Sequence, residues 1–188
     1  MPSSESLAPL EVLAPRDGAL PPGLLDELTE LYASNAAFHR VSGDFPDPDH
    51  VTPEQVASAL NAELAHPAVE VLLARDGADG SLAGIAVTLA EHPDPLDPYP
   101  WIGLLMVHGG RQRAGLGREL AGRVEARLRA AGRDGARLAV LDGNPGALAF
   151  WTSLGYRIVD HREDRQMGRP CAVLHKDLPP GPPRTIGG

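Results

Sequence analysis

A glycine-rich turn between an apolar segment and a helical segment is the part of this chain best suited to chemistry. Residues 104–107 are apolar, and a helical pattern starts near Leu116. Three glycines lie between these segments, Gly109, Gly110 and Gly115, and a fourth, Gly117, lies at the start of the helical pattern. The first turn of a helix has free backbone N–H groups and the positive end of the helix dipole, and glycines let an anion come close. The segment therefore predicts an anion site.

Two common nucleotide-binding loops do not fit this turn. A P-loop has Lys and then Ser or Thr after its second glycine, whereas Leu116 and Gly117 occupy those places here. A dinucleotide-binding fingerprint reads G-x-G-x-x-G, and Leu120 stands where its third glycine is required. We therefore do not expect ATP, GTP or NAD to bind through either loop.

The pattern that fits is Gln112-x-x-Gly115-x-Gly117, with Leu105 and Val107 on the preceding strand. It resembles the acetyl-CoA signature of the GNAT (GCN5-related N-acetyltransferase) family, which reads L-x-V, a four-residue turn and Q/R-x-x-G-x-G/A. A second family hallmark, N-x-x-A-x-x-F-Y-x-x-x-G-F, is present as Asn144, Ala147, Phe150, Trp151, Gly155 and Tyr156. The alternative is a strand, turn and helix whose glycines serve only close packing.

The resemblance implies acetyl-CoA as cosubstrate and no metal. Backbone groups of one strand would hydrogen-bond its pantetheine arm in a gap beside residues 136–141, namely Leu105, Met106 and Val107. The loop would hold the pyrophosphate through Gln112, Arg113, Ala114, Gly115, Leu116, Gly117 and Arg118. Residues of the second hallmark would contact the arm, namely Asn144, Ala147 and Phe150. Arg113 replaces a usual glycine, and Arg111 and Arg118 would add positive charge.

Two departures from the family pattern concern proton transfer. Trp151 replaces a Tyr that often protonates the leaving thiolate, and because an indole N–H is only a hydrogen-bond donor, we expect Trp151 to pack. Gly103 and Trp101 occupy positions where the family often has a Glu or His base. Glu91, at the end of the preceding strand, is the leading candidate base, acting through a water. A solvated strand-end acid is the equally weighted alternative.

The loops that would wall the acceptor in this family are acidic here. One carries Asp44, Asp47 and Asp49, and the opposite hairpin loop carries His92, Asp94 and Asp97. His92 is a weaker candidate base. Carboxylates on both walls favour a cationic acceptor, whereas acids that serve only solubility are the alternative.

The function we expect is transfer of an acetyl group from acetyl-CoA to a primary amine of a small molecule or peptide, by direct attack. One alternative is a non-catalytic acyl-CoA-binding module. Another is a toxin that acetylates aminoacyl-tRNA, which the acidic composition disfavours.

The elements that must position these residues follow from periodicity and turn signals. We expect strands at 9–14, 69–74, 82–90, 101–107, 136–141, 156–161 and 172–176, and helices at 22–39, 53–66, 116–131 and 145–154. Such an order predicts an α/β fold with a mixed sheet covered by helices. The resemblance adds a mostly antiparallel GNAT sheet with a splayed strand pair. One domain would span 1–178, followed by a disordered tail at 179–188.

Charge is divided unevenly along the chain. Residues 1–99 contain 17 acidic and 3 basic residues, residues 100–188 contain 8 and 14, and the net charge is −8. We therefore expect no nucleic-acid partner. Without a run of about 18 apolar residues or a basic signal-peptide start, we expect a cytoplasmic protein and no membrane partner. The single Cys171 excludes an intramolecular disulfide. Dimers are common in the family, so a homodimer is one expected state.

Overall fold

Seven strands form one sheet in the order β1-β2-β3-β4-β5-β7-β6. The computed structural model describes residues 6–14 and 18–180. The strands are β1 (Glu11–Val12), β2 (Val69–Arg75), β3 (Leu82–Leu89), β4 (Trp101–Val107), β5 (Gly135–Leu141), β6 (Arg157–Glu163) and β7 (Pro170–Asp177). Their pairings are antiparallel except that of β4 with β5, which is parallel. The predicted mixed, mostly antiparallel sheet is confirmed.

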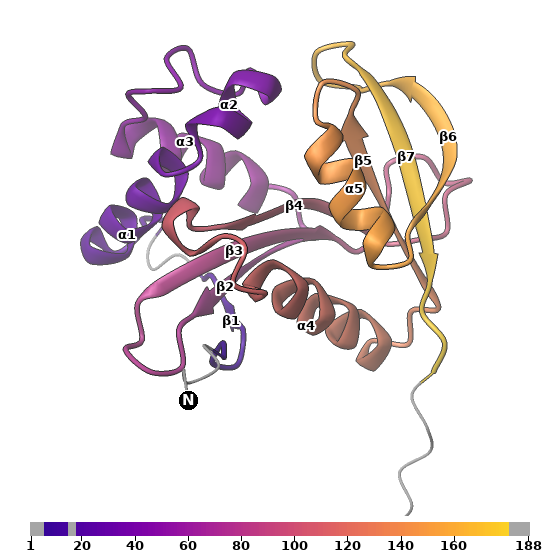
Figure 1. Cartoon of the computed structure of the whole chain (residues 1–188), viewed down its shortest axis with the longest axis horizontal. Coiled ribbons are helices and arrows are strands. Elements are labelled where there is room, and N and C mark those ends of the chain that lie inside the picture. The colour runs from indigo at the N-terminus through magenta and orange to yellow at the C-terminus, as the bar shows by residue number, and fades with distance from the viewer. Residues whose placement is uncertain (1–5, 15–17, 181–188) are drawn as a thin grey trace, which may run out of the picture.

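Helices cover both faces of this sheet (Figure 1). They are α1 (Pro22–Ala33), α2 (Ala36–Ser42), α3 (Pro53–Leu64), α4 (Leu116–Ala130) and α5 (Pro145–Ser153), with a short 3₁₀ turn, η1, at Gly109–Arg111. One apolar core joins α1 and α3 to one face, and a second joins α4, α5 and the opposite face. No helix in the described part of the chain is long and apolar enough to span a membrane.

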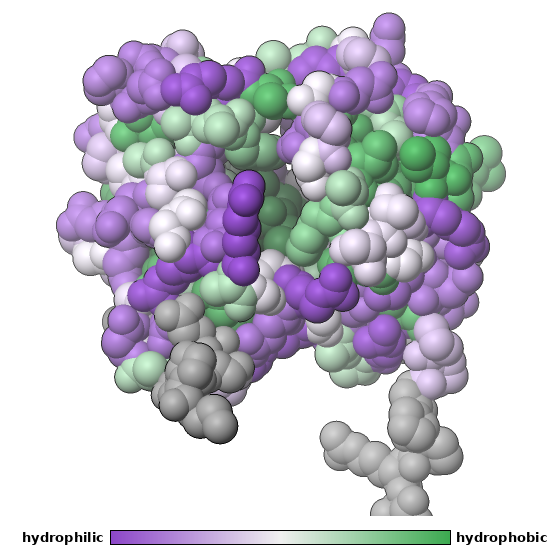
Figure 2. Space-filling model, viewed as in Figure 1, coloured by the Kyte–Doolittle hydropathy of each residue, from purple (hydrophilic) through white to green (hydrophobic). Residues whose placement is uncertain are grey.

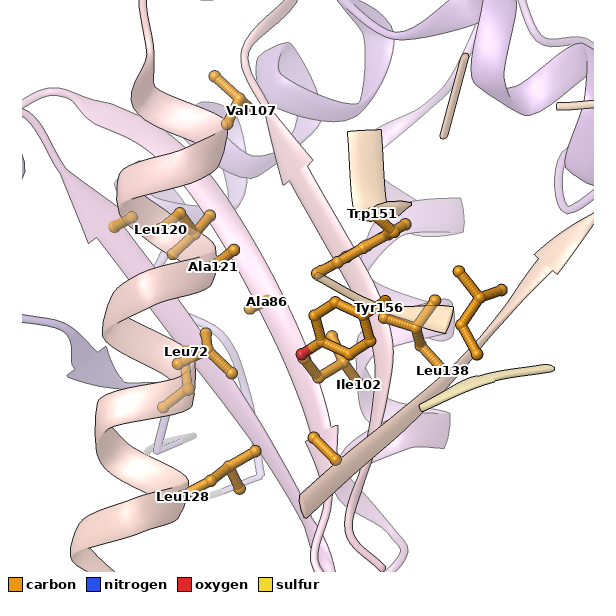
Figure 3. Close-up of a cluster of buried hydrophobic side chains, with 14 of the residues drawn as sticks. Leu72, Ala86, Ile102, Val107, Leu120, Ala121, Leu128, Leu138, Trp151 and Tyr156 are labelled. Atoms are coloured by element: carbon orange, nitrogen blue, oxygen red, sulfur yellow. The ribbon is translucent and has the colours of Figure 1, made fainter. Parts of the chain in front are cut away.

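The second core forms under α4. Its apolar stripe is buried as the spacing predicted, at Leu116, Leu120, Val124 and Leu128. Figure 3 shows Leu120 and Ala121 facing the sheet near Ala86. It also shows Trp151 and Tyr156 close to Leu138 of β5. Burial of these side chains fixes α4, and with it the glycine turn, against the sheet.

The single helix expected at 22–39 is wrong, because two helices, α1 and α2, meet at Ser34 and Asn35. Both side chains donate to the Leu31 carbonyl, Ser34 Oγ at 2.7 Å and Asn35 Nδ2 at 2.9 Å. Such side-chain bonds compete with the helical ladder. The strand expected at 9–14 is reduced to β1, with an isolated bridge between Leu7 and Asp76. Of the expected tail, residues 181–188 lie outside the described part.

Strands β4 and β5 separate almost as soon as they start. Their paired positions are Trp101 and Arg137, and the Arg137 N–H donates to the Pro100 carbonyl at 3.0 Å. Between β3 and β4, Val87 faces Leu104 and Thr88 faces Ile102, so Gly103 is an extra residue, a β-bulge. Because a bulge bends its strand, it favours this divergence. The expected splayed strand pair is confirmed.

Candidate active site

The glycine turn forms a cradle of free backbone donors. Among the described residues, none accepts a hydrogen bond from the N–H groups of residues 113–118, and the first bond of α4 runs from Glu119 N–H to the Gly115 carbonyl. Arg113 and Gly115 both have left-handed backbone, with φ of 65° and 89°. The cradle therefore opens at the N-terminus of a 15-residue helix, which suits a pyrophosphate.

Two of the three arginines near the cradle remain available to an anion. Arg113 and Arg118 are exposed, and Arg118 Nη2 donates to Ser153 Oγ at 3.3 Å. Arg111, expected to add positive charge near the loop, instead binds Asp76 Oδ2 and Ser81 Oγ, both at 2.7 Å. Asp76 is 6% exposed, and a buried carboxylate needs a counter-charge. Arg111 therefore fixes the β2–β3 hairpin against the start of the cradle.

The end of β4 turns backbone groups toward the gap. The His108 N–H donates to the Ala83 carbonyl on β3 at 2.9 Å. Since backbone groups alternate along a strand, those of Leu105 and Val107 point the other way, toward β5. The Val107 carbonyl already accepts from Asn35 Nδ2 at 3.1 Å. The Leu105 N–H and C=O and the Val107 N–H are thus the groups that β4 offers to a pantetheine arm.

Met106 does not share this orientation. Its side chain is 5% exposed in the core beneath α1 and α3, and its carbonyl lies against Gly84 of β3. Of the three consecutive residues expected to contact acyl-CoA, the structure brings Leu105 and Val107 to the gap.

The second sequence hallmark meets the first at the start of α4. A Cβ placed on Gly117 would lie 3.4 Å from the Phe150 ring and 3.9 Å from Val107 Cγ2. Asn144 starts α5 by accepting from the Ala147 N–H at 3.0 Å, and Ala147 is half-buried. Figure 2 shows this face hollowed at its centre, with apolar residues inside the hollow, between the α1–α3 side and the α5 side.

Trp151 lies in the core. It is 8% exposed, and its ring meets Tyr156 and Phe150 edge-on at centroid distances of 5.0 and 5.1 Å. Figure 3 shows the Trp151 ring beside Tyr156. This packing supports the expected role of Trp151 as a wall rather than as an acid.

Glu91 and His92 lie near the closed end of the splay. Glu91 is exposed in the loop after β3, and the adjacent Ala90 carbonyl accepts from Arg133 Nη2 at 3.0 Å. His92 stacks on Trp101, which is in the paired part of β4, at 4.8 Å. The structure therefore does not bring Glu91 next to Leu105 and Val107.

The ring of His92 is held in one tautomer. Its Nδ1 accepts from the Asp94 N–H at 3.1 Å, which leaves the proton of the neutral ring on Nε2. Burial, aided by the charges of Arg165 and Arg162, lowers the pKa of His92 below its usual 6.5. A neutral ring held in this way suits a wall better than a base.

The acids expected to wall the acceptor have cationic neighbours on the β6–β7 hairpin. Asp44 Oδ1 lies 3.8 Å from Arg169 Nη1, and Asp94 Oδ2 lies 3.9 Å from Arg165 Nη2. Asp47 instead binds the nearby His50, at 2.8 Å. The two acidic loops are thus brought together through the hairpin, with part of their charge neutralised.

Two features of this site were missed in the sequence. Gly103 interrupts an otherwise continuous apolar strand, and an isolated glycine in a strand is a signal for a bulge. The contacts of the hairpin arginines, Arg165 and Arg169, with the acidic loops gave no local signal, because Asp94 and Asp44 lie more than 70 residues away in the sequence. The shorter contact of Arg169, at 2.6 Å, is with Asp164 of its own hairpin.

Comparison with known proteins is consistent with this geometry. The sequence profile of the acetyltransferase (GNAT) family matches residues 28–156. None of the curated proteins compared matches the chain. Among solved structures, 470 chains are similar.

Three of the similar structures are named acetyltransferases. An acetyltransferase from Thermus thermophilus has 22% identity and a TM-score of 0.68, over 92% of this chain and 99% of the other. Spermidine N-acetyltransferase from Vibrio cholerae has 15% identity and a TM-score of 0.63, over 90% and 95%. The ribosomal-protein-S18-alanine N-acetyltransferase from Escherichia coli has 17% and 0.58, over 95% and 99%. At these identities the likeness shows the fold alone.

Proposed function

This chain belongs to the GNAT acetyltransferase family, and from that premise we propose that it moves an acetyl group from acetyl-CoA to a primary amine of a small molecule or peptide. One observation carries the proposal. The gap between β4 and β5 runs from the pair at Trp101 and Arg137 to a cradle of free N–H groups at residues 113–118. An extended arm in the gap would thus end with its pyrophosphate at the start of α4.

Different residues along this path bind different parts of acetyl-CoA. The cradle N–H groups, with Arg113 and Arg118, hold the pyrophosphate. The Leu105 backbone pairs with the arm as a neighbouring strand would. Asn144, Ala147 and Phe150 line the α5 side. Acetyl-CoA supplies a thioester carbonyl, which the acceptor nitrogen attacks directly.

A backbone donor near Val107 polarises the thioester carbonyl. The Val107 N–H points toward the gap, and the hydrogen bond from Asn35 to the Val107 carbonyl helps to hold this end of β4 in position. In this proposal water protonates the departing thiolate, since Trp151 packs in the core.

The acidic walls and the named acceptors of two structural neighbours support the choice of acceptor class. Asp44 and Asp94 keep partial exposure beside their arginine partners, so a cationic amine would compete for them. One neighbour is named for acetylating spermidine and another for acetylating an alanine of a ribosomal protein, and both acceptors are amines. We infer a cationic amine acceptor for this chain.

A panel of acceptors tests the proposal. Diamines, polyamines, neutral alkylamines, amino acids and peptides with a free N-terminus are offered with acetyl-CoA, and thiol release is followed. We expect turnover, with kcat/KM highest for cationic amines. A preference for anionic acceptors would contradict the acidic walls, and failure of every amine together with measurable acetyl-CoA binding would favour the binding-module alternative.

The candidate base is tested separately. Because the Glu91 carboxylate is exposed at the closed end and not beside Val107, it can take a proton from the acceptor only through a chain of waters. Glu91→Gln is expected to lower kcat by about 100-fold. An unchanged kcat would show that the acceptor deprotonates without Glu91.

A further inference from the structure

The break between α1 and α2 holds a buried side chain whose partners belong to the acyl-CoA site. Asn35 is 7% exposed. Its Nδ2 donates to the Leu31 carbonyl at 2.9 Å and to the Val107 carbonyl at 3.1 Å, and its Oδ1 accepts from Gln112 Nε2 at 2.8 Å. One side chain thus joins a helix end, the last residue of β4 and the first motif residue of the loop.

The orientation of this amide is fixed by its neighbours. The Leu31 and Val107 carbonyls can only accept hydrogen bonds, so they must face the Nδ2 donors of Asn35. The remaining oxygen then faces Gln112, whose Nε2 also lies 3.4 Å from the Val107 carbonyl. Asn35 therefore holds the side chain of Gln112. The backbone N–H groups of residues 113–118 take no part in this contact and stay free to face an anion.

A second contact fastens the same break to the loop. Ser34 Oγ accepts from the Gly109 N–H at 2.8 Å. A Cβ placed on Gly109 would lie only 2.2 Å from the Ser34 carbonyl oxygen, so residue 109 must be glycine for this approach. The α1–α2 break and the loop are therefore packed together at the level of the backbone.

The same break also sets the start of α2. The Asn35 carbonyl accepts from Phe38 N–H at 3.0 Å and His39 N–H at 3.2 Å. At the other end of α2, the Val41 side chain approaches Gly143, a residue of the β5–α5 loop across the gap. Asn35 thus connects the helix that borders the gap to the loop that would hold the pyrophosphate.

We propose that Asn35 is a positioning residue for acyl-CoA. By saturating the Val107 carbonyl and holding the Gln112 side chain, it keeps the end of β4 and the cradle in the arrangement that receives the arm and the pyrophosphate. This inference rests on the proposed function. An ordinary helix-break residue would affect stability, whereas a positioning residue also affects affinity for CoA.

Binding of CoA to the full chain, measured by calorimetry, tests the inference. Asn35→Ala is expected to raise the Kd for CoA by roughly five- to tenfold, the factor that corresponds to about one lost hydrogen bond. Its kcat at saturating acetyl-CoA should fall as well, because the same contact holds the end of β4 that carries the Val107 N–H. Asn35→Ser, which is neutral and too short to reach both carbonyls, serves if the alanine variant does not fold.

A matched control and a double variant separate positioning from stability. His39 is another buried polar residue of the same helix layer, and its Nε2 lies 2.9 Å from the Tyr32 carbonyl oxygen. His39→Phe, the matched control, should lower stability without changing the Kd for CoA. Asn35→Ala combined with Gln112→Leu should cost no more affinity than the larger single effect.

The outcomes are distinguishable. An Asn35 variant that folds and binds CoA like the wild type would overturn the inference, as would strictly additive losses in the double variant. A wild-type chain that does not bind CoA at all would instead overturn the proposed function.

Discussion

Among single residues, the cradle depends on backbone conformations that most side chains avoid. Arg113 is the one described residue other than glycine with positive φ, and left-handed backbone costs such a residue roughly 1–2 kcal/mol. Strain of this kind is typical of sites whose geometry is imposed by function. Glycine adopts the left-handed conformation without this strain, as Gly115 does here. A Cβ placed on Gly115 would have no neighbour within 4 Å.

Gly115→Glu should therefore abolish binding of acetyl-CoA, with a Kd raised by at least about 100-fold. The variant combines backbone strain with a carboxylate placed where the pyrophosphate belongs. Gly132→Glu is the matched control, because Gly132 has a similar φ of 77°, no neighbour within 4 Å and a place outside the cradle. Equal affinity of the Gly115 variant and the wild type in calorimetry would refute the loop assignment.

Among the elements, α2 contributes a histidine that is buried inside the layer of α1, α2 and α3. His39 is 1% exposed, lies 4.8 Å from the Phe45 ring, and its Nε2 pairs with the Tyr32 carbonyl at 2.9 Å. Burial lowers the pKa of His39 below its usual 6.5 despite that bond and the charge of Asp44. The neutral ring is therefore the form that the folded helix layer accommodates.

Stability should accordingly fall as the pH drops below about 6.5. Over the interval from that value down to the lowered pKa, the unfolded chain binds a proton at His39 that the folded chain does not. Chemical unfolding at pH 7.5 and 5.5 should show a smaller loss of unfolding free energy for His39→Phe than for the wild type. His92, whose pKa is also lowered, is present in both proteins and cancels in the comparison. Equal losses would show that the histidine is not responsible.

Across the whole molecule, part of the uneven charge distribution is offset by ion pairs between the two halves of the sequence. Acids of the first half bind arginines of the second in several places, namely Asp44–Arg169, Glu70–Arg127, Asp76–Arg111, Asp94–Arg165 and Asp97–Arg137. Two of these pairs join β2 and the turn after it to α4 and η1, and the other three join the loops around Asp44 and Asp94 to β5 and the β6–β7 hairpin. This pairing reduces the charge that an acceptor would meet, and the cationic acceptor stays a prediction.

The boundary between β4 and β5 is weakly joined by backbone bonds, because these strands share a single register pair. A ligand lying in the gap should therefore tighten contact between its two sides. At a concentration of 100 times its Kd, acetyl-CoA should raise the unfolding free energy by about 2.7 kcal/mol. Amide hydrogen exchange should slow in β5 and α5 as well as in residues 112–118. Protection confined to the loop would show that the arm does not enter the gap.

Local patterns in the sequence were sufficient to locate most elements and the cofactor motif. Apolar periodicity located α4 and its buried stripe, and the spacing from Leu105 to Gly117 identified the acetyl-CoA signature, because both depend on neighbours within a few turns of chain. The hallmark residues Gly117 and Phe150 were also known as members of two motifs, although their contact was not.

The groups that face the gap, by contrast, were established by tertiary contacts. The pairing of Arg111 with Asp76 and the contact of Asn35 with Val107 depend on partners distant in sequence. Local patterns cannot reveal such partners. The apolar periodicity of residues 22–39, for example, contains no sign that Asn35 binds a carbonyl of β4. Apolar periodicity in the sequence determines which face of a helix or strand is buried. Long-range hydrogen bonds and ion pairs, which only the tertiary structure brings together, determine where the functional groups on that element lie.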